Sequence, residues 1–324
     1  MPRRRFGNLD SIRAGKASKA QFDRWREDRF RKLRNKAYSI NCVPNVAPDL
    51  PFLQNNRSEP SITWIGHSTF LIQMAGLNIV TDPVWARRMA FQRRLAPPGI
   101  ELSDMPSVDV VLISHSHYDH LHVSSLRRLR GPKRMIVPAG LRKKLLLRGF
   151  LQCDEMHWWE DTSLQGVKFT FVPAQHWTRR NPWDMNTSHW GGWVLQIDHG
   201  PTIYFAGDSG YFRGFQEIGR KFKIDVALLP IGAYDPEWFM ASQHVSPEEA
   251  LQAFIDVGAK YFVPMHYGAF KLSDDTPIDA LQRLEAARQQ LGIPAEKIFL
   301  LKHGETMRFQ SNTPDTEAKD GLHT

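Results

Sequence analysis

An apolar run that ends in a cluster of histidines is the feature that most constrains this chain. Residues Val108–Ser114 are typical of a buried strand, and Ser114-His115-Ser116-His117-Tyr118-Asp119-His120 stands at its end. Residues i and i+2 of an extended segment point the same way, so His115 and His117 can bind one metal ion. The turn that follows directs Asp119 and His120 toward another. The pattern therefore predicts two metal sites side by side.

Three further candidate ligands lie just beyond other predicted strands. Each follows an apolar run: His176 after Val167–Val172, Asp208 after Thr202–Ala206, and His266 after Tyr261–Pro264. Asp208 is the natural bridge between two ions, because a carboxylate has an oxygen for each ion whereas a neutral imidazole has one lone pair.

The chemistry of these ligands indicates which metal they hold and how it is used. Imidazole and carboxylate without thiolate suit Zn²⁺, although Fe or Mn would also be held. Three or four protein ligands per ion leave positions for water, which is typical of catalytic rather than structural sites. We therefore expect two Zn²⁺ per chain, with Fe or Mn as alternatives.

Short apolar runs between turn signals predict the sheets. The expected strands are Ser61–Trp64, Thr69–Met74, Leu77–Thr81, Val108–Ser114, Met135–Val137, Val167–Val172, Trp193–Ile197, Thr202–Ala206, Val226–Leu229, Tyr261–Pro264 and Ile298–Lys302. Helices are expected at Ser246–Val257, where Ser246 and Glu249 form a capping box, and at Asp279–Leu291. An opening meander followed by alternating strands and helices predicts sheets covered by helices on their outer faces.

Charge and composition divide the chain into three parts. Residues 1–40 carry 13 Lys/Arg and 4 Asp/Glu, a net +9 against +8 for the whole chain, so the remainder is close to neutral. We expect a basic extension and linker at 1–60, a catalytic domain at 61–310 and a polar tail at 311–324. The apolar spacing of Phe22, Trp25, Phe30 and Leu33 indicates a short amphipathic helix, which would dock on the body or lie on an anionic membrane, with nucleic acid a remote third option.

Composition also excludes some classes of protein. No window contains the roughly 18–20 apolar residues that a membrane span requires, and the basic start is followed by no apolar signal region. Cys42 and Cys153 are isolated, which argues against both a disulfide framework and a thiolate zinc site. These observations predict a cytoplasmic protein, with peripheral membrane contact through its basic segment.

The order of these motifs resembles the metallo-β-lactamase superfamily between about Ser61 and Glu305. The resemblance implies a four-layer αβ/βα sandwich with the metals at the edge where strands end. It implies a first zinc on His115, His117 and His176, a second on Asp119, His120 and His266, and Asp208 shared by both.

A narrower resemblance is to the phospholipases D that hydrolyse N-acyl-phosphatidylethanolamine. It rests on Trp64-Ile65-Gly66-His67, Thr81-Asp82-Pro83, Leu112–Leu121, Gln175-His176-Trp177, Phe205–Tyr211, Pro230–Tyr234, Trp238–Met240, Gln243-His244-Val245 and Lys302–Glu305. It implies a zinc phosphodiesterase that forms phosphatidic acid and an N-acylethanolamine at a membrane surface, with Asp208 catalytic, His244 facing the substrate phosphate, and a homodimer. No match covers the first 60 residues. Two alternatives stay open: a lactonase or other hydrolase of a soluble phosphorylated substrate, and a metal-binding scaffold without catalysis.

The roles of several neighbouring residues stay open at this point. His67 makes a structural hydrogen bond or takes part in catalysis, and Asp82 orients a metal-bound histidine or stabilises a turn. Near His176 stand two arginines and four tryptophans, which line a substrate groove or pack in the core: Arg179, Arg180, Trp177, Trp183, Trp190 and Trp193. The candidates for substrate contact are Trp177, Arg180, Tyr211 and Gln243.

Overall fold

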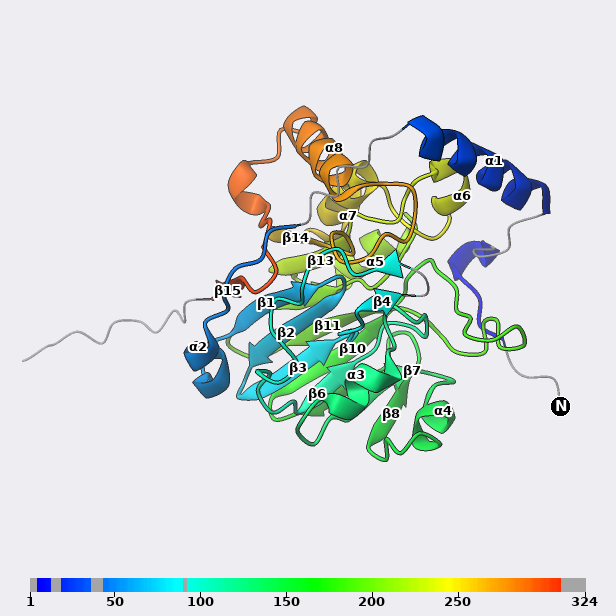
Figure 1. The fold of residues 1–324 in the computed structure, drawn as a ribbon. Helices are drawn as coiled ribbons and strands as arrows, with labels where there is room; N and C mark the ends of the chain where they lie inside the picture. The colour runs from blue at the N-terminus through cyan, green and yellow to red at the C-terminus, as the bar shows by residue number, and fades with distance from the viewer. Residues whose placement is uncertain (1–4, 13–18, 36–42, 90–91, 310–324) are drawn as a thin grey trace, which may run out of the picture.

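The computed structural model describes residues 5–12, 19–35, 43–89 and 92–309, and two β-sheets lie at its centre (Figure 1). The first sheet has the strand order β15-β1-β2-β3-β6-β7-β8, and the second has the order β14-β13-β12-β11-β10-β9. The strands of the first sheet are β1 (Ser61–Gly66), β2 (Thr69–Met74), β3 (Leu77–Thr81), β6 (Val110–Leu112), β7 (Arg134–Pro138), β8 (Cys153–Met156) and β15 (Thr306–Arg308). Those of the second are β9 (Asp161–Leu164), β10 (Val167–Val172), β11 (Gly192–Gln196), β12 (Ile203–Phe205), β13 (Val226–Pro230) and β14 (Tyr261–Met265). A small ribbon pairs β4 (Arg88–Met89) with β5 (Gln92–Arg93).

Helices cover the outer faces of both sheets. On the first sheet lie α2 (Leu50–Asn55), α3 (Val123–Arg128) and α4 (Arg142–Leu146), whose Leu53, Leu126 and Leu145 are buried with the strand residues Val80 and Val111. On the second lie α5 (Gly214–Lys221), α7 (Pro247–Val257) and, packed against α7, α8 (Pro277–Gln290). The inner faces of the two sheets share one apolar core, so the expected four-layer αβ/βα sandwich is confirmed.

Strand direction explains why the predicted ligands can meet. β1 is antiparallel to β2, β2 is antiparallel to β3, and β3 is parallel to β6, so β1, β3 and β6 end at the same edge. The same reasoning brings the ends of β10, β12 and β14 to one edge of the second sheet. The segments that follow these six strands carry the histidines and carboxylates.

Most predicted elements are confirmed, with shifts of one or two residues at their ends. The capping box of α7 is present, because the Ser246 hydroxyl accepts the Glu249 N–H and the Glu249 carboxylate accepts the Ser246 N–H. The predicted strand Ile298–Lys302 is wrong: this segment is irregular and meets the sheet in one isolated bridge between Phe262 and Ile298. The prediction omitted β8, β9, β15 and the β4–β5 ribbon, which are short or largely polar. It also omitted α2, inside the predicted linker.

The N-terminal segment folds back over the body. The predicted helix is present as α1 (Lys19–Asn35), and of its four apolar residues the structure describes the side chain of Trp25 alone. The Trp25 ring stacks on Phe239 of α6 (Glu237–Met240), with centroids 6.2 Å apart, and the Arg24 guanidinium lies 4.5 Å from the Trp238 ring. The segment thus contacts the body. Arg3, Arg4, Cys42 and the predicted tail 311–324 lie outside the described residues.

No helix in the described ranges combines the length and apolar character needed to cross a bilayer.

Candidate metal centre

The structure brings all seven predicted ligands together where the strands of both sheets end. The cluster His115–His120 follows β6, His176 follows β10, Asp208 follows β12 and His266 follows β14. Close packing requires unusual backbone at one of these points, just before Asp208. Gly207 has a φ of +63°, and a Cβ there would lie 2.6 Å from the Ser114 Cβ, so glycine before Asp208 lets β12 approach the histidine cluster.

The first group of ligands consists of His115, His117 and His176. The Nδ1 atom of His117 lies 2.9 Å from Nε2 of His115 and 3.2 Å from Nε2 of His176. The nearest oxygen of Asp208 is 3.9 Å from Nε2 of both His115 and His176. Three imidazole nitrogens therefore face one point, with a carboxylate close by.

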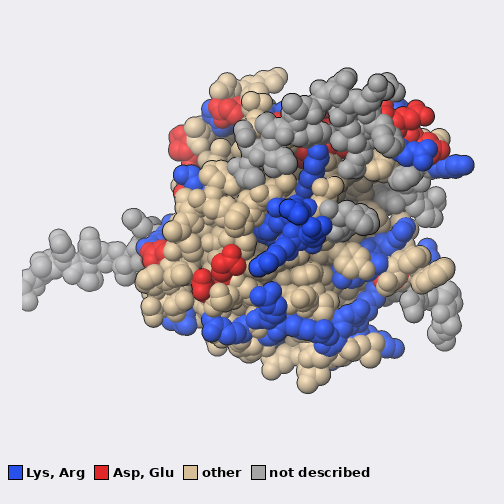
Figure 2. All heavy atoms as spheres, in the orientation of Figure 1, with Lys and Arg blue, Asp and Glu red and all other residues tan. Residues whose placement is uncertain are grey.

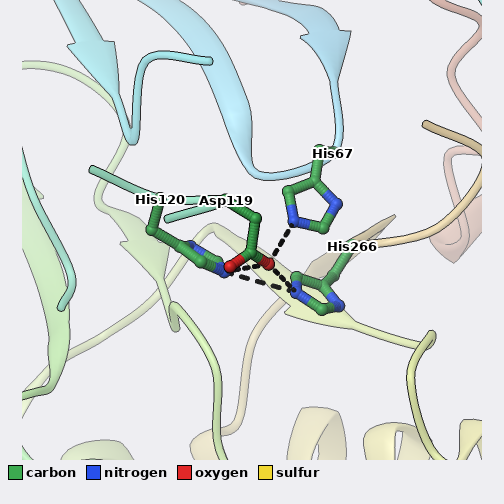
Figure 3. A group of neighbouring side chains, drawn as sticks. All are labelled: His67, Asp119, His120 and His266. Atoms are coloured by element: carbon green, nitrogen blue, oxygen red, sulfur yellow. Dashed lines mark hydrogen bonds and ion pairs between the residues drawn. The ribbon is translucent and has the colours of Figure 1, made fainter. Parts of the chain in front are cut away.

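The second group consists of Asp119, His120, His266 and the same oxygen of Asp208 (Figure 3 shows the first three with His67). Asp208 Oδ2 lies 3.1 Å from Nε2 of both His120 and His266. Asp119 Oδ2 lies 3.3 Å and 3.6 Å from the same two nitrogens. A tetrahedral cation with bonds of about 2.0–2.1 Å needs ligand atoms roughly 3.3 Å apart. These four distances, and the 3.3 Å between the His120 and His266 Nε2 atoms, fit such an ion.

The nitrogens that face away from the centre are held by other groups. The Nδ1 atom of His120 lies 2.7 Å from Asp82 Oδ2, and Nδ1 of His176 lies 2.9 Å from the Gln243 carbonyl oxygen. The Ser114 hydroxyl lies 2.9 Å from Nδ1 of His115 and donates to Asp82. Each contact orients its ring and leaves Nε2 free to bind a metal. Oδ1 of Asp208 is buried and has no hydrogen-bond partner within the described part of the chain, as expected of a metal-ligand oxygen.

The electrostatics of the cluster also favour a bound cation. Burial lowers the pKa of His176 to about 3 and that of His117 to about 4, so these rings are neutral, as metal ligation requires. Burial lowers the pKa of His266, but the charge of Asp208 and the hydrogen bonds to Asp119 and Asp208 together outweigh burial and raise this pKa to about 9. The buried carboxylates thus demand nearby positive charge, which either protons or metal ions can supply.

Asp82 and His67 stand directly behind the ligands. Asp82 is fully buried and its two oxygens accept the Ser114 N–H at 2.7 Å, the Ser114 hydroxyl at 2.5 Å and the His120 ring N–H. His67 Nε2 lies 3.0 Å from Asp119 Oδ2. Both residues therefore position a ligand by a hydrogen bond.

His244 and the candidate substrate contacts occupy different places. His244 lies 3.9 Å from Asp208 Oδ2 through Nδ1 and lines the pocket over the cluster, as do Gln243 and Trp177, which are hydrogen-bonded to each other. Arg180 instead lies under the ligand loop, where Nη1 donates to the Ser116 and Leu121 carbonyls at 2.8 Å. Tyr211 does not line this pocket, and its hydroxyl donates to Asp256 of α7.

The tryptophans predicted to surround His176 differ in burial and in position. Trp190 and Trp193 are buried in the body, with indole N–H groups donated to the carbonyls of Ala174 and Ile113. Trp183 is 80% exposed. Of this set, Trp177 alone lines the pocket over the metal cluster.

That pocket has a volume of about 700 Å³ and opens above the ligands. Polar groups at its base are His117, Asp119, Asp208 and His244. Its walls are largely apolar and come from Trp25, Met89, Tyr118, Trp177, Ala233, Phe239, Met240 and Leu272. The site therefore offers metal chemistry at the end of an apolar hollow.

One functional contact has no signal in the sequence. Asn8, in the N-terminal extension, hydrogen-bonds to the backbone of His176. It belongs to none of the motifs, and it lies 168 residues from its partner.

Residues 77–267 match the family model of the Beta-lactamase superfamily domain, which covers more than half of the chain and contains all seven ligands. The chain belongs to the metallo-β-lactamase superfamily. A solved metallo hydrolase of this fold from Ignicoccus hospitalis has 26% sequence identity and a TM-score of 0.58, with 78% of this chain and 99% of that one covered.

Two curated relatives are similar to this chain over most of its length. N-acyl-phosphatidylethanolamine-hydrolyzing phospholipase D 1 of Caenorhabditis elegans is 36% identical over 252 residues, 71% of this chain and 70% of the relative. A metal-dependent hydrolase of Myxococcus xanthus is 31% identical over 232 residues, 69% of this chain and 76% of the relative. Both names describe hydrolases, and the second describes a metal-dependent one, so this superfamily member is a metal-dependent hydrolase.

Proposed function

We propose that this hydrolase is a dinuclear zinc phosphodiesterase that cleaves an N-acylated phospholipid into phosphatidic acid and an N-acylethanolamine. The observation that carries the proposal is the pairing of two ligand groups, joined by Asp208, with an apolar-walled pocket of about 700 Å³. A phospholipid combines a polar phosphodiester with long acyl chains. The phosphodiester matches the polar base of the pocket, and the acyl chains match its apolar walls. The name of the nematode relative supports the same substrate class.

The metals that these residues hold would supply a Lewis acid and a water activated near neutral pH. The chain's own groups then account for binding and proton movement. Apolar walls such as Phe239 and Met240 hold the acyl chains out of water. Water oxygen bonds to phosphorus as the bond from phosphorus to the ethanolamine oxygen breaks, and the departing oxygen takes a proton.

His244 is the side chain placed to manage that proton. Its ring lies beside Asp208 at the base of the pocket, while its Nδ1 has no hydrogen-bond partner among the described residues. A histidine so placed can donate a hydrogen bond to a phosphoryl oxygen or a proton to the leaving group. Two neighbouring residues thus have different tasks in this proposal. The Gln243 carbonyl oxygen orients the His176 ring, and His244 faces the substrate.

The test uses zinc-loaded protein and vesicles that contain N-acyl-phosphatidylethanolamine, followed by lipid mass spectrometry. We expect phosphatidic acid and N-acylethanolamine to appear in equal amounts, with Asp208→Asn abolishing turnover and lowering bound metal. The exposed carboxylate Asp198 supplies a matched control, because Asp198→Asn leaves both unchanged. Hydrolysis of a soluble lactone with intact lipid would overturn the proposed substrate, and full activity in Asp208→Asn would remove this residue from the mechanism.

A further inference from the structure

A long stretch of the chain beside the metal centre is cationic without interruption. Residues 120–153 contain nine Lys/Arg and no Asp/Glu, namely Arg127, Arg128, Arg130, Lys133, Arg134, Arg142, Lys143, Lys144 and Arg148. The body of the protein is close to neutral in total, so this stretch makes its charge distribution strongly uneven. Figure 2 shows the resulting belt of Lys and Arg across the part of the surface where α3 and α4 lie.

Several of these cations have no acidic partner. Arg134 pairs with Asp154 and Lys144 pairs with Asp184. Within the described residues, Arg127, Arg128, Lys143 and Arg148 form no ion pair. An uncompensated cluster of this kind attracts a polyanionic surface.

Large apolar side chains project from the same region. Leu147 is 79% exposed and Leu151 is 78% exposed, both in the connection between α4 and β8, and Trp183 is 80% exposed. The 179–187 segment that carries Trp183 adjoins α4, because Lys144 reaches Asp184 at 3.3 Å and residues of both segments line one hollow of about 780 Å³. We call Leu147, Leu151, Trp183, Lys143 and Arg148 the α4 face.

The α4 face borders the pocket over the metal cluster. Tyr118, which is 51% exposed, lines both that pocket and the hollow beside α4. The Arg180 guanidinium packs on its ring at 4.0 Å. A surface that docked on the α4 face would therefore lie next to the entrance of the active site.

We propose that the α4 face docks on an anionic lipid bilayer, with Leu147, Leu151 and Trp183 entering the interface and Lys143 and Arg148 against the head groups. The proposal deepens the proposed function, since a lipid substrate must pass from a bilayer into the pocket. Exposed leucines gain by leaving water for the acyl boundary, and tryptophan favours the head-group level. A nucleic acid would satisfy the cations but would give the two leucines nothing to bury against.

The α4 face is a better docking surface than α1, where the sequence placed membrane contact. Two of the cations of α1 have acidic neighbours on the same helix, since Arg24 lies 3.9 Å from Asp28 and Arg26 lies 3.7 Å from Asp23. Trp25 of α1 is directed to Phe239 of the body.

The experiment is co-sedimentation of full-length metal-loaded protein with vesicles of phosphatidylcholine alone or with 30% phosphatidylglycerol. We expect binding to the anionic vesicles that weakens with added salt. The variant K143E/R148E lowers the partition coefficient at least roughly 25-fold, about fivefold per cation, and L147S/W183S lowers it about tenfold or more. These side chains are largely exposed, so melting temperature and metal content stay at the wild-type values.

A matched control comes from the far side of the molecule. Leu300 is 52% exposed beyond α8, and L300S together with K297E reproduces the same types of change there. Equal loss of vesicle binding in this control overturns the proposal, and so does a wild-type protein that does not bind anionic vesicles. Binding to duplex DNA without any affinity for anionic vesicles also overturns it. Hydrolysis of a soluble phosphodiester stays unchanged in the α4-face variants. Vesicle binding without lipid cleavage would overturn the proposed function and leave the docking surface standing.

Discussion

The side-chain amide of Asn8 forms hydrogen bonds with both polar groups of the His176 backbone, the carbonyl and the N–H. Nδ2 of Asn8 donates to the His176 carbonyl at 3.0 Å, and the His176 N–H donates to Oδ1 at 3.0 Å. The same oxygen accepts the Trp190 indole N–H at 2.8 Å. The amide thus makes the same pair of hydrogen bonds with the His176 backbone that a residue of a neighbouring β-strand would make. Part of the N-terminal extension is thereby built into the metal centre.

Asn8→Ala should weaken metal binding without touching any ligand. His176 loses the contacts that position its backbone, so we expect about tenfold weaker retention of the first metal, measured by chelator competition. The free energy of unfolding should fall by about 1–3 kcal/mol, since four side-chain hydrogen bonds are lost, the fourth being the one from Nδ2 to the Ile12 carbonyl. Asp10→Ala provides the control, because it breaks the exposed pair with Arg213 on the same segment and should leave metal retention unchanged. Equal metal retention in Asn8→Ala and wild type would refute the coupling.

Asp82→Asn should act on the second metal through His120. An amide cannot accept from the Ser114 backbone, the Ser114 hydroxyl and the His120 ring together, so the ring loses its fixed orientation. We expect metal affinity to fall about 10- to 100-fold in a zinc titration.

The control for Asp82 lies in the segment that leads into β6. Asp109 accepts the Asn78 N–H at 2.8 Å, the same kind of bond far from the ligands. Asp109→Asn should lower thermal stability while metal affinity stays at the wild-type value. A loss of affinity in both variants would point to general loosening of the sheet instead.

Arg180→Lys distinguishes support of the ligand loop from substrate binding. Lysine cannot span two carbonyls and stack on Tyr118 as the guanidinium does, so kcat and metal content should fall while KM for bis(4-nitrophenyl) phosphate stays nearly constant. Arg179→Lys, an exposed neighbour, should change neither. A raised KM with full metal content would show instead that Arg180 contacts the substrate.

Asp275, which accepts the N–H of the pocket residue Ala233, should make stability depend on pH. Burial raises its pKa from the ordinary 3.8 to about 6. Between these values the folded protein keeps a proton that the unfolded chain has released, so the stabilisation present below pH 3.8 is lost as pH rises through 6.

The variant Asp275→Asn should not show this pH-dependent loss of stability, because an amide side chain does not titrate. Relative to wild type, the variant should gain at most about 3 kcal/mol in free energy of unfolding between pH 4 and pH 8, measured by urea denaturation. Asp198→Asn, at an exposed position, should show no such gain. A gain of equal size at both pH values would contradict the assignment to this carboxyl.

The ligand cluster and the general architecture follow from the sequence because both are local patterns. His115 and His117 alternate directly after an apolar strand, and Ser246 with Glu249 marks a helix start within four residues. Strand β9 escaped prediction because the residues Asp161–Leu164 are largely polar, and it forms as the edge partner of β10. Ile298–Lys302 has the apolar character of a strand, but it makes one isolated bridge to the sheet.

What the sequence alone determined is which chemistry is available: donor atoms placed at the ends of apolar strands, where chain direction brings them to one edge. Tertiary structure decided which neighbours hold those donors. Asn8 reaches His176 across 168 residues, and Arg180 lies under the ligand loop instead of in the pocket. Such contacts depend on how two sheets and an N-terminal segment pack, and no spacing along the chain encodes the distance between side chains so far apart.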